Sequence, residues 1–390
     1  MKNINKWSSF LVVLFITFGL NVSAFAKTFQ SSDFEGNWYA YGIEVDPTPP
    51  GQVYWLWGNT TVNESGDVTG TYHGPDGTSV PISGGQIALD PKGIISGYFT
   101  ADELTSSIVN GKLDQSKTKG AAVSVGNDGT MDLLTFIKGG GTFTSSDIQG
   151  SWYQYVITID IANERVYWAY GLLTIDGSGN ATGNFTGPDG TMVSVSGSIF
   201  LNPDGILSGS ATLLADGDSS TQSIVNGKLD QSKTNGTFVS LNSNDFSSMN
   251  IGYLVKSGGV FNQSDVQGNW YVYTMNIDPN TPAVYWAYGK VGIDALGNVK
   301  GSYIGPIGPK IKVTSTLQMD NEGLSTNGTF NFDTGDSGIV PSIKLDQGKT
   351  SMTGVGIITS GSSTGTMSIL QFYKESNLFS PAIPFLLLDQ

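Results

Sequence analysis

The chain has 390 residues, with 33 acidic against 19 basic side chains, a formal charge of −14 and no cysteine. The acidic balance argues against nucleic acid and anionic lipid as partners, because both repel a negatively charged protein. The lack of cysteine excludes disulfides, thiolate metal sites and a lipid-modified cysteine.

Residues 1–26 have the pattern of a secretory signal peptide. Basic residues precede an apolar run from Phe10 to Leu20, and small residues offer a cleavage site after Ala26. The apolar run is too short for a permanent membrane anchor. We therefore expect a secreted or periplasmic protein of the bacterial envelope, without stable membrane insertion, whose mature chain begins at Lys27.

The rest of the chain repeats one unit three times. A Gly-x-Trp-Tyr marker recurs around Trp38, Trp152 and Trp270, and Lys-Leu-Asp-Gln recurs at 112–115, 228–231 and 344–347. A period this long indicates one domain per copy, because solenoid repeats are only about 20–50 residues long. The expected segments are repeats 27–143, 144–261 and 262–377, followed by an apolar tail at 378–390.

Each repeat reads as a series of short strands. Strand-like runs separated by turns rich in Gly, Asn and Asp predict neighbouring antiparallel strands. Eight such strands can close into a barrel that leaves no exposed edge. We expect an all-β fold of three tandem antiparallel up-and-down β-barrels, and the alternative is a six-bladed β-propeller. In the second copy the runs are 151–160, 165–176, 181–187, 191–201, 206–214, 222–230, 236–241 and 249–256.

The acidic turns, such as 176–180 and 202–205, have two interpretations. Glycine falls where a hairpin needs a left-handed residue, and the carboxylates could instead bind calcium. The Asp-x-Asp-x-Asp-Gly pattern of calcium loops is missing, which favours turn chemistry. We expect no metal site and no cofactor.

The opening of each copy resembles that of the calycins, the family of lipocalin-type and avidin-type eight-stranded barrels. The resemblance rests on Gly-x-Trp and on a lysine of the last strand. It implies a short 3₁₀ turn before the first strand, capped by an aspartate, and a lysine that packs over the tryptophan. The residues concerned are Asp33, Asp147 and Asp265, and the pairs Trp38 with Lys138, Trp152 with Lys256 and Trp270 with Lys374.

Tyrosines alternate with the tryptophan along the first strand of each copy. Tyr39 and Tyr41 lie on the face opposite Trp38, and that face is the more apolar one. We therefore expect the tyrosines to face the barrel interior. In ligand-carrying calycins the tryptophan faces inward, so either a bulge follows Trp38 or the outside of the barrel is also buried.

The second strand of each copy carries an aromatic ladder. Such a ladder either packs one barrel on the next, which is the commoner outcome, or forms a groove that binds sugar rings or flat ligands. A groove would occur three times and would gain affinity from multivalency. The ladder residues are Tyr54, Trp55, Trp57, Tyr167, Trp168, Tyr170, Tyr285, Trp286 and Tyr288.

Other polar motifs point to structure rather than catalysis. Lys112 and Asp114, with their equivalents in the other copies, read as a solvated surface pair. Gly335-Asp336-Ser337-Gly338 looks like a protease nucleophile motif, but a similar turn stands at 217–219, and His73 belongs to no repeated site. We expect no enzymatic activity.

Three functions remain. The first is an exported, non-enzymatic repeat protein that acts as a structural or adhesive/binding module, with envelope or surface proteins or glycans as partners. The alternative is a calycin-like carrier of small apolar or sugar-like ligands. An outer-membrane barrel is disfavoured because polar residues interrupt the candidate lipid-facing strands. The tail at 378–388 either caps its own array or docks on another chain.

Overall fold

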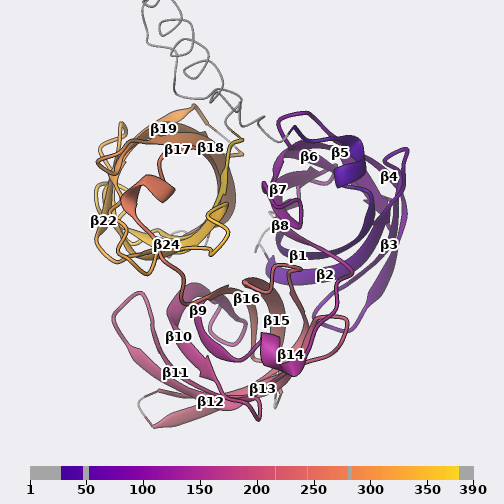
Figure 1. Cartoon of the computed structure of the whole chain (residues 1–390), viewed down its shortest axis with the longest axis horizontal. Coiled ribbons are helices and arrows are strands. Elements are labelled where there is room, and N and C mark those ends of the chain that lie inside the picture. Colours follow the sequence, from indigo (N-terminus) through magenta and orange to yellow (C-terminus); the bar gives the residue numbers. More distant parts are fainter. Residues whose placement is uncertain are drawn as a thin grey trace, which may run out of the picture. The chain divides into compact units, whose positions relative to one another are not determined.

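The computed structural model describes residues 28–46, 52–215, 217–243, 245–279, 283–306 and 308–376. Phe29–Glu375 forms one compact unit, in which Figure 1 shows three β-barrels. Within the described ranges, no helix has the length and apolar character needed to cross a membrane. The expected signal peptide, its cleavage site and the tail at 378–390 lie outside the described residues.

Barrel 1 is a closed ring of eight antiparallel strands that follow one another in chain order. A 3₁₀ turn, η1 (Ser31–Asp33), leads into it. Its strands are β1 (Gly36–Asp46), β2 (Gln52–Val62), β3 (Val68–His73), β4 (Ser79–Leu89), β5 (Ile94–Ala101), β6 (Leu104–Leu113), β7 (Lys119–Gly126) and β8 (Met131–Lys138).

Barrel 2 repeats this arrangement after η2 (Ser145–Asp147). All eight strands expected in the second copy are present; the largest difference is at β14, which begins four residues before the expected 222. Its strands are β9 (Gly150–Asp160), β10 (Arg165–Ile175), β11 (Asn180–Thr186), β12 (Met192–Leu201), β13 (Ile206–Ala215), β14 (Asp218–Leu229), β15 (Asn235–Asn242) and β16 (Ser248–Lys256).

Barrel 3 follows η3 (Gln263–Asp265) and differs in one strand. The strand that corresponds to β5 and β13 is broken into β21 and β22, and the ring closes through pairing of β23 with β24. Its strands are β17 (Gly268–Asp278), β18 (Ala283–Ile293), β19 (Asn298–Ile304), β20 (Ile311–Thr316), β21 (Leu324–Ser325), β22 (Gly328–Phe332), β23 (Ser337–Leu345), β24 (Ser351–Ser360) and β25 (Met367–Lys374).

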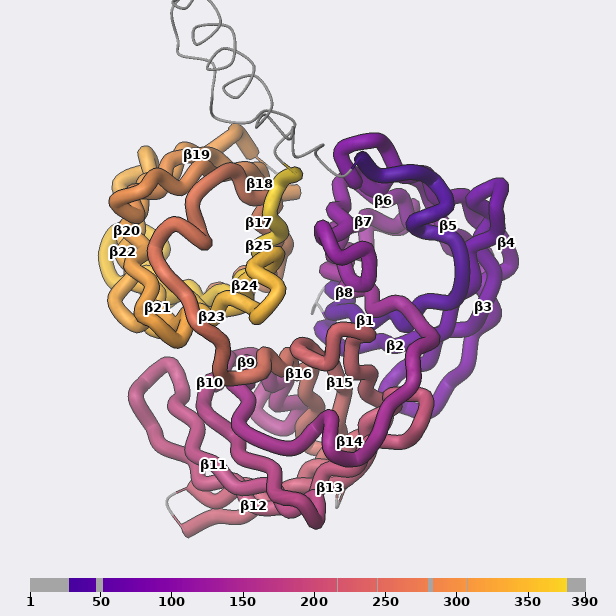
Figure 2. The backbone as a smooth tube through the Cα atoms, in the orientation of Figure 1, coloured from indigo at the N-terminus to yellow at the C-terminus, as the bar shows by residue number. Residues whose placement is uncertain are grey.

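The prediction of three antiparallel barrels is confirmed, and the propeller alternative is wrong. In each copy the first strand pairs with the last, as β1 does with β8, β9 with β16 and β17 with β25. A propeller blade would leave these edges open, whereas a closed ring pairs them. Figure 2 shows the backbone of each barrel curving around its own interior.

Each barrel encloses a core built around its signature tryptophan. In barrel 1, Trp38 and Ala40 of β1 point inward and join Phe34, Leu134 and Phe136. Barrels 2 and 3 have equivalent cores around Trp152 and Trp270.

The tyrosines face outward, so the prediction that they face the interior is wrong. Tyr41, Ile43 and Val45 lie on the outer face of β1, where they are fully or almost fully buried against residues of the other two barrels. A fourth core therefore lies between the barrels. The outer face is the more apolar one because the neighbouring barrels, rather than water, cover it.

Hydrogen bonds link the three barrels in a ring. A tyrosine hydroxyl of each barrel bonds a side chain of the next, and an indole N–H of each barrel donates to a backbone carbonyl of the next. The hydroxyl bonds are Tyr41–Asn226 (2.7 Å), Tyr155–Ser342 (3.0 Å) and Tyr273–Asn110 (2.7 Å). The indole bonds are Trp55–Ser240, Trp168–Gly356 and Trp286–Ser124, each 3.1 Å.

Candidate functional site

The aromatic ladder lies mainly at the contacts between barrels. Trp55, Trp168 and Trp286 are at most 2% exposed and belong to the inter-barrel core. Their rings have no free face on which a ligand could stack. The remaining ladder residues are partly buried; Trp57 stacks on His73 at 4.3 Å between ring centroids, so this histidine takes part in an aromatic contact.

The tryptophan and lysine of the signature meet at the closed end of each barrel. Trp38 donates from Nε1 to the carbonyl of Phe34 at 2.8 Å. Lys138 lies with Nζ 5.3 Å from the Trp38 ring and donates to the carbonyl of Asp33 at 2.7 Å. The carboxylate of Asp33 accepts the backbone N–H of Gln30, which fixes the 3₁₀ turn. Barrels 2 and 3 repeat this with Trp152, Lys256 and Asp147, and with Trp270, Lys374 and Asp265.

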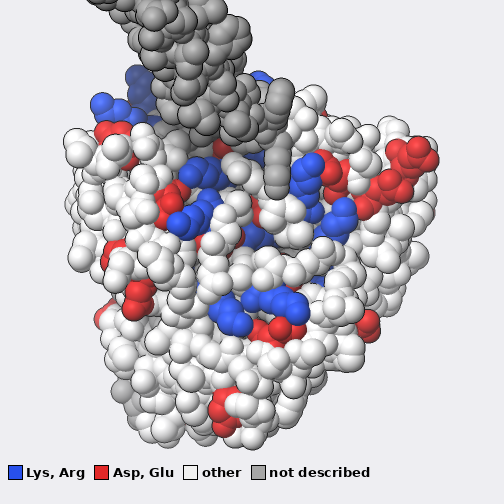
Figure 3. Space-filling view, in the orientation of Figure 1, with Lys and Arg blue, Asp and Glu red and all other residues white. Residues whose placement is uncertain are grey.

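Side chains of opposite charge lie beside each other on the face of the molecule that Figure 3 draws. Lysine and arginine side chains occur there in small groups, with acidic side chains next to them. One ion pair recurs in each barrel between a turn lysine and the aspartate of the 3₁₀ turn. These pairs are Lys117–Asp33 (2.6 Å), Lys233–Asp147 (2.8 Å) and Lys349–Asp265 (2.8 Å).

The prediction that Lys112 and Asp114 form a surface pair is wrong, because both are fully buried. Lys112 donates from Nζ to the carbonyl of Leu113 at 2.7 Å and lies 4.3 Å from the ring of Phe29. Asp114 accepts the backbone N–H groups of the turn that follows β6. Strand alternation placed both on one face correctly, but it could not show that the neighbouring structure covers that face. The equivalents Lys228, Asp230, Lys344 and Asp346 are likewise buried.

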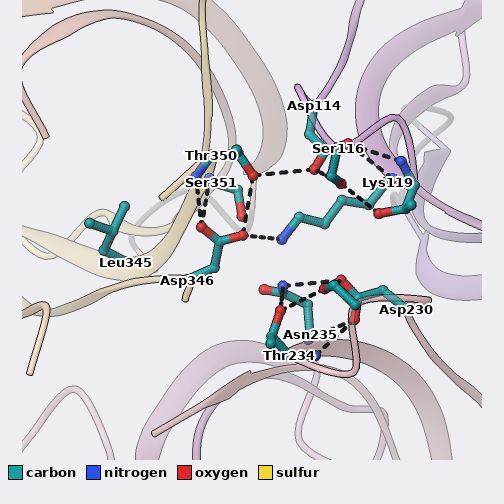
Figure 4. Close-up of polar contacts among 12 residues, drawn as sticks. Asp114, Ser116, Lys119, Asp230, Thr234, Asn235, Leu345, Asp346, Thr350 and Ser351 are labelled. Atoms are coloured by element: carbon teal, nitrogen blue, oxygen red, sulfur yellow. Dashed lines mark hydrogen bonds and ion pairs between the residues drawn. The ribbon is translucent and has the colours of Figure 1, made fainter. Parts of the chain in front are cut away.

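The three buried aspartates approach one another where the barrels meet (Figure 4). Lys119 of barrel 1 reaches Asp346 of barrel 3 at 2.9 Å. Burial disfavours the charged form of Asp346, but the charge and hydrogen bond of Lys119, together with backbone N–H bonds, keep the pKa of Asp346 below its usual value. Burial raises the pKa of Asp114, since Lys119 offsets it only in part. The positions equivalent to Lys119 hold the neutral Asn235 and Ser351, so only one of the three equivalent positions supplies a cation. Each aspartate also interacts with the buried lysine two positions before it.

The acidic turns use their carboxylates to fix backbone geometry. Asp176 accepts the N–H groups of Ser178 and Asn180 at 2.8 and 2.9 Å. Asp336, in the motif that looks like a protease nucleophile turn, accepts the N–H of Ser363 at 3.1 Å. The Asp176 bonds are turn chemistry of the expected kind, whereas the Asp336 bond links two separate loops.

A cavity of about 80 Å³ lies inside barrel 1. Apolar and aromatic side chains from most of its strands form the wall, among them Trp38, Phe99 and Phe136. The wall includes Ala40, whose counterparts are the larger Gln154 in barrel 2 and Val272 in barrel 3. A smaller side chain at this position leaves more of the interior unfilled.

The end of the cavity away from Trp38 is polar. Glu44 of β1 and Asp132 of β8 line it and are direct cross-strand partners. The Tyr54 hydroxyl donates to Glu44 on one side, and the Ser124 hydroxyl donates to Asp132 at 2.7 Å on the other. The interior therefore combines an apolar wall with a pair of carboxyl groups, which is the composition of a small-molecule site.

The sequence analysis missed Glu44 and Asp132. A signal was present, because Glu44 shares the inward face of β1 with Trp38, and its counterparts Thr158 and Asn276 are neutral. Asp132 likewise replaces Asn250 and Ser368 of the other copies. A comparison of the copies position by position would have found two acids at interior positions of one barrel alone.

No family model and no curated protein matches the chain. Among solved structures, it is similar to a protein of unknown function from the DUF3598 family of Nostoc punctiforme, at 11% identity and TM-score 0.22, over 58% of this chain and 97% of that one. It is also similar to Transferrin Binding Protein B of Haemophilus parasuis Hp5, at 8% identity and TM-score 0.25, over 86% of this chain and 76% of the other. The isotype 1 protein from serogroup B Neisseria meningitidis matches at 9% identity and TM-score 0.24, over 87% and 77%.

Similarity at these TM-scores carries no argument about function. The class of the protein rests on its own strand order: three closed, antiparallel, eight-stranded rings, each with an inward Gly-x-Trp and a last-strand lysine over the tryptophan. The described chain is a protein of three calycin-like barrels joined into one body.

Proposed function

We propose that this protein is an exported, non-enzymatic module of the cell envelope or surface with a structural or binding role. The observation that supports the proposal is the buried core between the barrels, in which each barrel bonds the next. Such a core holds three barrels as one body with fixed outer surfaces, which suits a module that positions or binds other molecules. Export is inferred from the N-terminal pattern of residues 1–26.

Export and envelope binding can be tested on the full chain in a bacterial host. We expect the protein in the periplasm or medium, with an N-terminus at Lys27 by sequencing, and saturable sedimentation of the purified mature protein with isolated envelopes. An Ala26→Lys variant, which blocks cleavage, is the control for processing. An uncleaved cytosolic chain would contradict export, and a lack of saturable sedimentation would contradict the envelope-binding role.

The cavity of barrel 1 favours a second candidate, a calycin-like carrier of a small apolar ligand. We expect the mature protein to bind xenon, a small apolar probe of such cavities, with one site per chain by xenon NMR, because the cavity lies in one barrel. Ala40→Val, which introduces the side chain that barrel 3 carries at this position, should weaken xenon binding while leaving the circular dichroism spectrum unchanged. Xenon binding that Ala40→Val does not alter would contradict a site inside barrel 1.

A further inference from the structure

One oxygen of the carboxyl pair at the polar end of the barrel 1 cavity, Oδ1 of Asp132, has no hydrogen-bond donor among the described residues. Asp132 is 2% exposed, and its other oxygen, Oδ2, accepts from Ser124. A buried acceptor without a partner is costly and is rare in native structures. Oδ1 is therefore free to accept a hydrogen bond from a molecule in the cavity.

The pair also lies in an acidic environment. Burial raises the pKa of Asp132 well above its usual value, and the Glu44 carboxyl adds to this effect. Burial likewise raises the pKa of Glu44, with Asp128 and Asp46 contributing in the same direction against the bond from Tyr54. The two carboxyl groups also interact through a side-chain hydrogen bond, in which they share a proton. A cation between them would take the place of that proton and favour ionisation of both groups.

At the positions equivalent to Glu44 and Asp132, the other two barrels carry neutral side chains. In barrel 2, Asn250 donates from Nδ2 to Gln222 at 2.9 Å. In barrel 3, the Ser368 hydroxyl donates to Asn276 at 2.7 Å. Neutral side chains that bond one another thus replace the acids of barrel 1. The acid pair is specific to the barrel with the described cavity.

The cavity is small. Its volume of about 80 Å³ is space for about five water molecules, because a cavity needs roughly 15 Å³ to hold one. This volume fits a short alkyl chain with one polar head group.

We propose that the interior of barrel 1 binds one small primary amine per chain, with a short alkyl chain against the apolar wall and the protonated amine between Glu44 and Asp132. The proposal deepens the carrier candidate and rests on it. An ammonium group offers three donors and a positive charge, so it can bond Oδ1 of Asp132 and the Glu44 carboxylate together. An alcohol of the same length offers one donor, and a carboxylate adds a third negative group.

The test compares butylamine, butanol and butanoate by titration calorimetry with the mature chain, at one pH. We expect one site per chain, with butylamine binding at least about tenfold more tightly than butanol, as a charge-assisted bond would give, and with butanoate binding weakest. The double variant Glu44→Thr, Asp132→Asn copies the side chains of barrel 2. It should bind butanol as before and lose the preference for the amine.

Glu64→Gln, which removes an exposed acid of the same barrel, is the matched control and should keep the preference. Circular dichroism establishes that each variant is folded. Equal affinity for the three head groups, a preference for butanoate, or an amine preference that survives in the double variant would overturn the assignment of the head group while leaving the carrier candidate intact. Failure of all three compounds and of xenon to bind would overturn the carrier candidate and this proposal together.

Discussion

Lys112, Lys228 and Lys344 are charged side chains that the barrels bury completely. Each donates from Nζ to the carbonyl of the next residue in the chain. Each also lies over a phenylalanine ring, at 4.2 to 4.3 Å from its centroid. These contacts compensate only part of the lost hydration, so burial lowers the pKa of each lysine to about 8.

The lowered pKa values predict that the protein becomes more stable as the pH rises from about 7 to about 9.5. Between pH 8 and the ordinary lysine value of 10.5, the unfolded chain holds more protons than the folded chain, so the free energy of unfolding increases with pH. Each lysine contributes at most about 1.4 kcal/mol per pH unit. Urea unfolding at a series of pH values measures the slope.

Lys112→Met should reduce this slope, whereas Lys92→Met, which changes an exposed lysine, should leave it unchanged. Above about pH 10 the buried tyrosines oppose the trend, because their pKa values are raised in the folded chain. A stability that stays flat or falls between pH 7 and 9.5 would show that these lysines are not desolvated.

At the scale of single elements, one hairpin glycine is fixed by what surrounds it. Gly205 has φ +77, and a Cβ there would meet Lys228 Nζ at 2.5 Å and the Phe143 ring at 2.6 Å. Gly93 and Gly323 hold the same place in the other barrels, with φ +78 and +73. The hairpin thus needs glycine both for its backbone and for close approach to the buried lysine.

Gly205→Ala is expected to destabilise the protein more than Gly190→Ala. Gly190 has φ +84, but nothing lies within 4 Å of the place that a Cβ would take there, so its substitution costs only backbone strain of about 1 kcal/mol. Gly205→Ala adds overpacking of about 1–3 kcal/mol. The difference between the urea midpoints of the two variants measures the added cost of overpacking. Equal midpoints would mean that Lys228 and Phe143 can move aside.

The strands were largely predictable from the sequence, and their surroundings were not. Turn residues mark the hairpins of the second copy, because left-handed glycines and capping aspartates leave a local signal. The break between β21 and β22 falls directly before Gly328, where Asn327-Gly328 is a turn signal that the analysis of the second copy could not show. The inward or outward direction of Tyr41 was predicted wrongly because period-two alternation identifies two faces without showing which one meets another barrel.

At the scale of the whole molecule, the contact of the three barrels depends on an unequal set of charges. Three buried aspartates meet there, and Lys119 pairs with Asp346 from a position that is 5% exposed. The hydroxyl of Thr350 in barrel 3 also donates to Asp114 of barrel 1, at 3.3 Å. Removal of the lysine would leave Asp346 without its ion-pair partner, and breaking a buried ion pair is strongly destabilising.

Lys119→Met is expected to destabilise the protein by about 3–5 kcal/mol near neutral pH, the usual cost of breaking a buried ion pair. The pKa of Asp346 is lowered in the folded protein, so its stabilising effect is lost as the pH falls through that value. The loss of stability that Lys119→Met causes should therefore be smaller in acid. Chemical unfolding at pH 7 and at about pH 2.5, which lies below the ordinary aspartate value of 3.8, measures both, with Lys310→Met as an exposed control; an equal deficit at both pH values would contradict the pairing.

The core between the barrels predicts that the three unfold together. Calorimetry of the mature chain should give one transition, with equal calorimetric and van't Hoff enthalpies. Limited proteolysis should leave the joints near 143 and 261 intact, since Gln231 donates to the carbonyl of Gly139 at 2.6 Å and Gln347 to that of Ser257 at 2.9 Å. Three separate transitions, or early cuts at both joints, would show that the barrels are independent.

The candidate site was only partly predictable. The ladder was recognised as either inter-barrel contact or groove, and the sequence could not decide because it does not show that Trp55 meets the backbone of Ser240. Glu44 and Asp132 are 88 positions apart and become neighbours only through the pairing of β1 with β8. Their importance depends on closure of the ring, which is a property of the fold rather than of either segment.

Because the three similar barrels belong to one polypeptide, they can carry different residues at equivalent positions, which identical subunits cannot do. In a symmetric homotrimer, every substitution appears three times, so a lysine such as Lys119 would bring three cations to the axis. In the single chain, that position is Lys119 in one copy, Asn235 in the second and Ser351 in the third. The interior of one barrel can therefore evolve a specialised site while the other two barrels keep the residues that hold the three together.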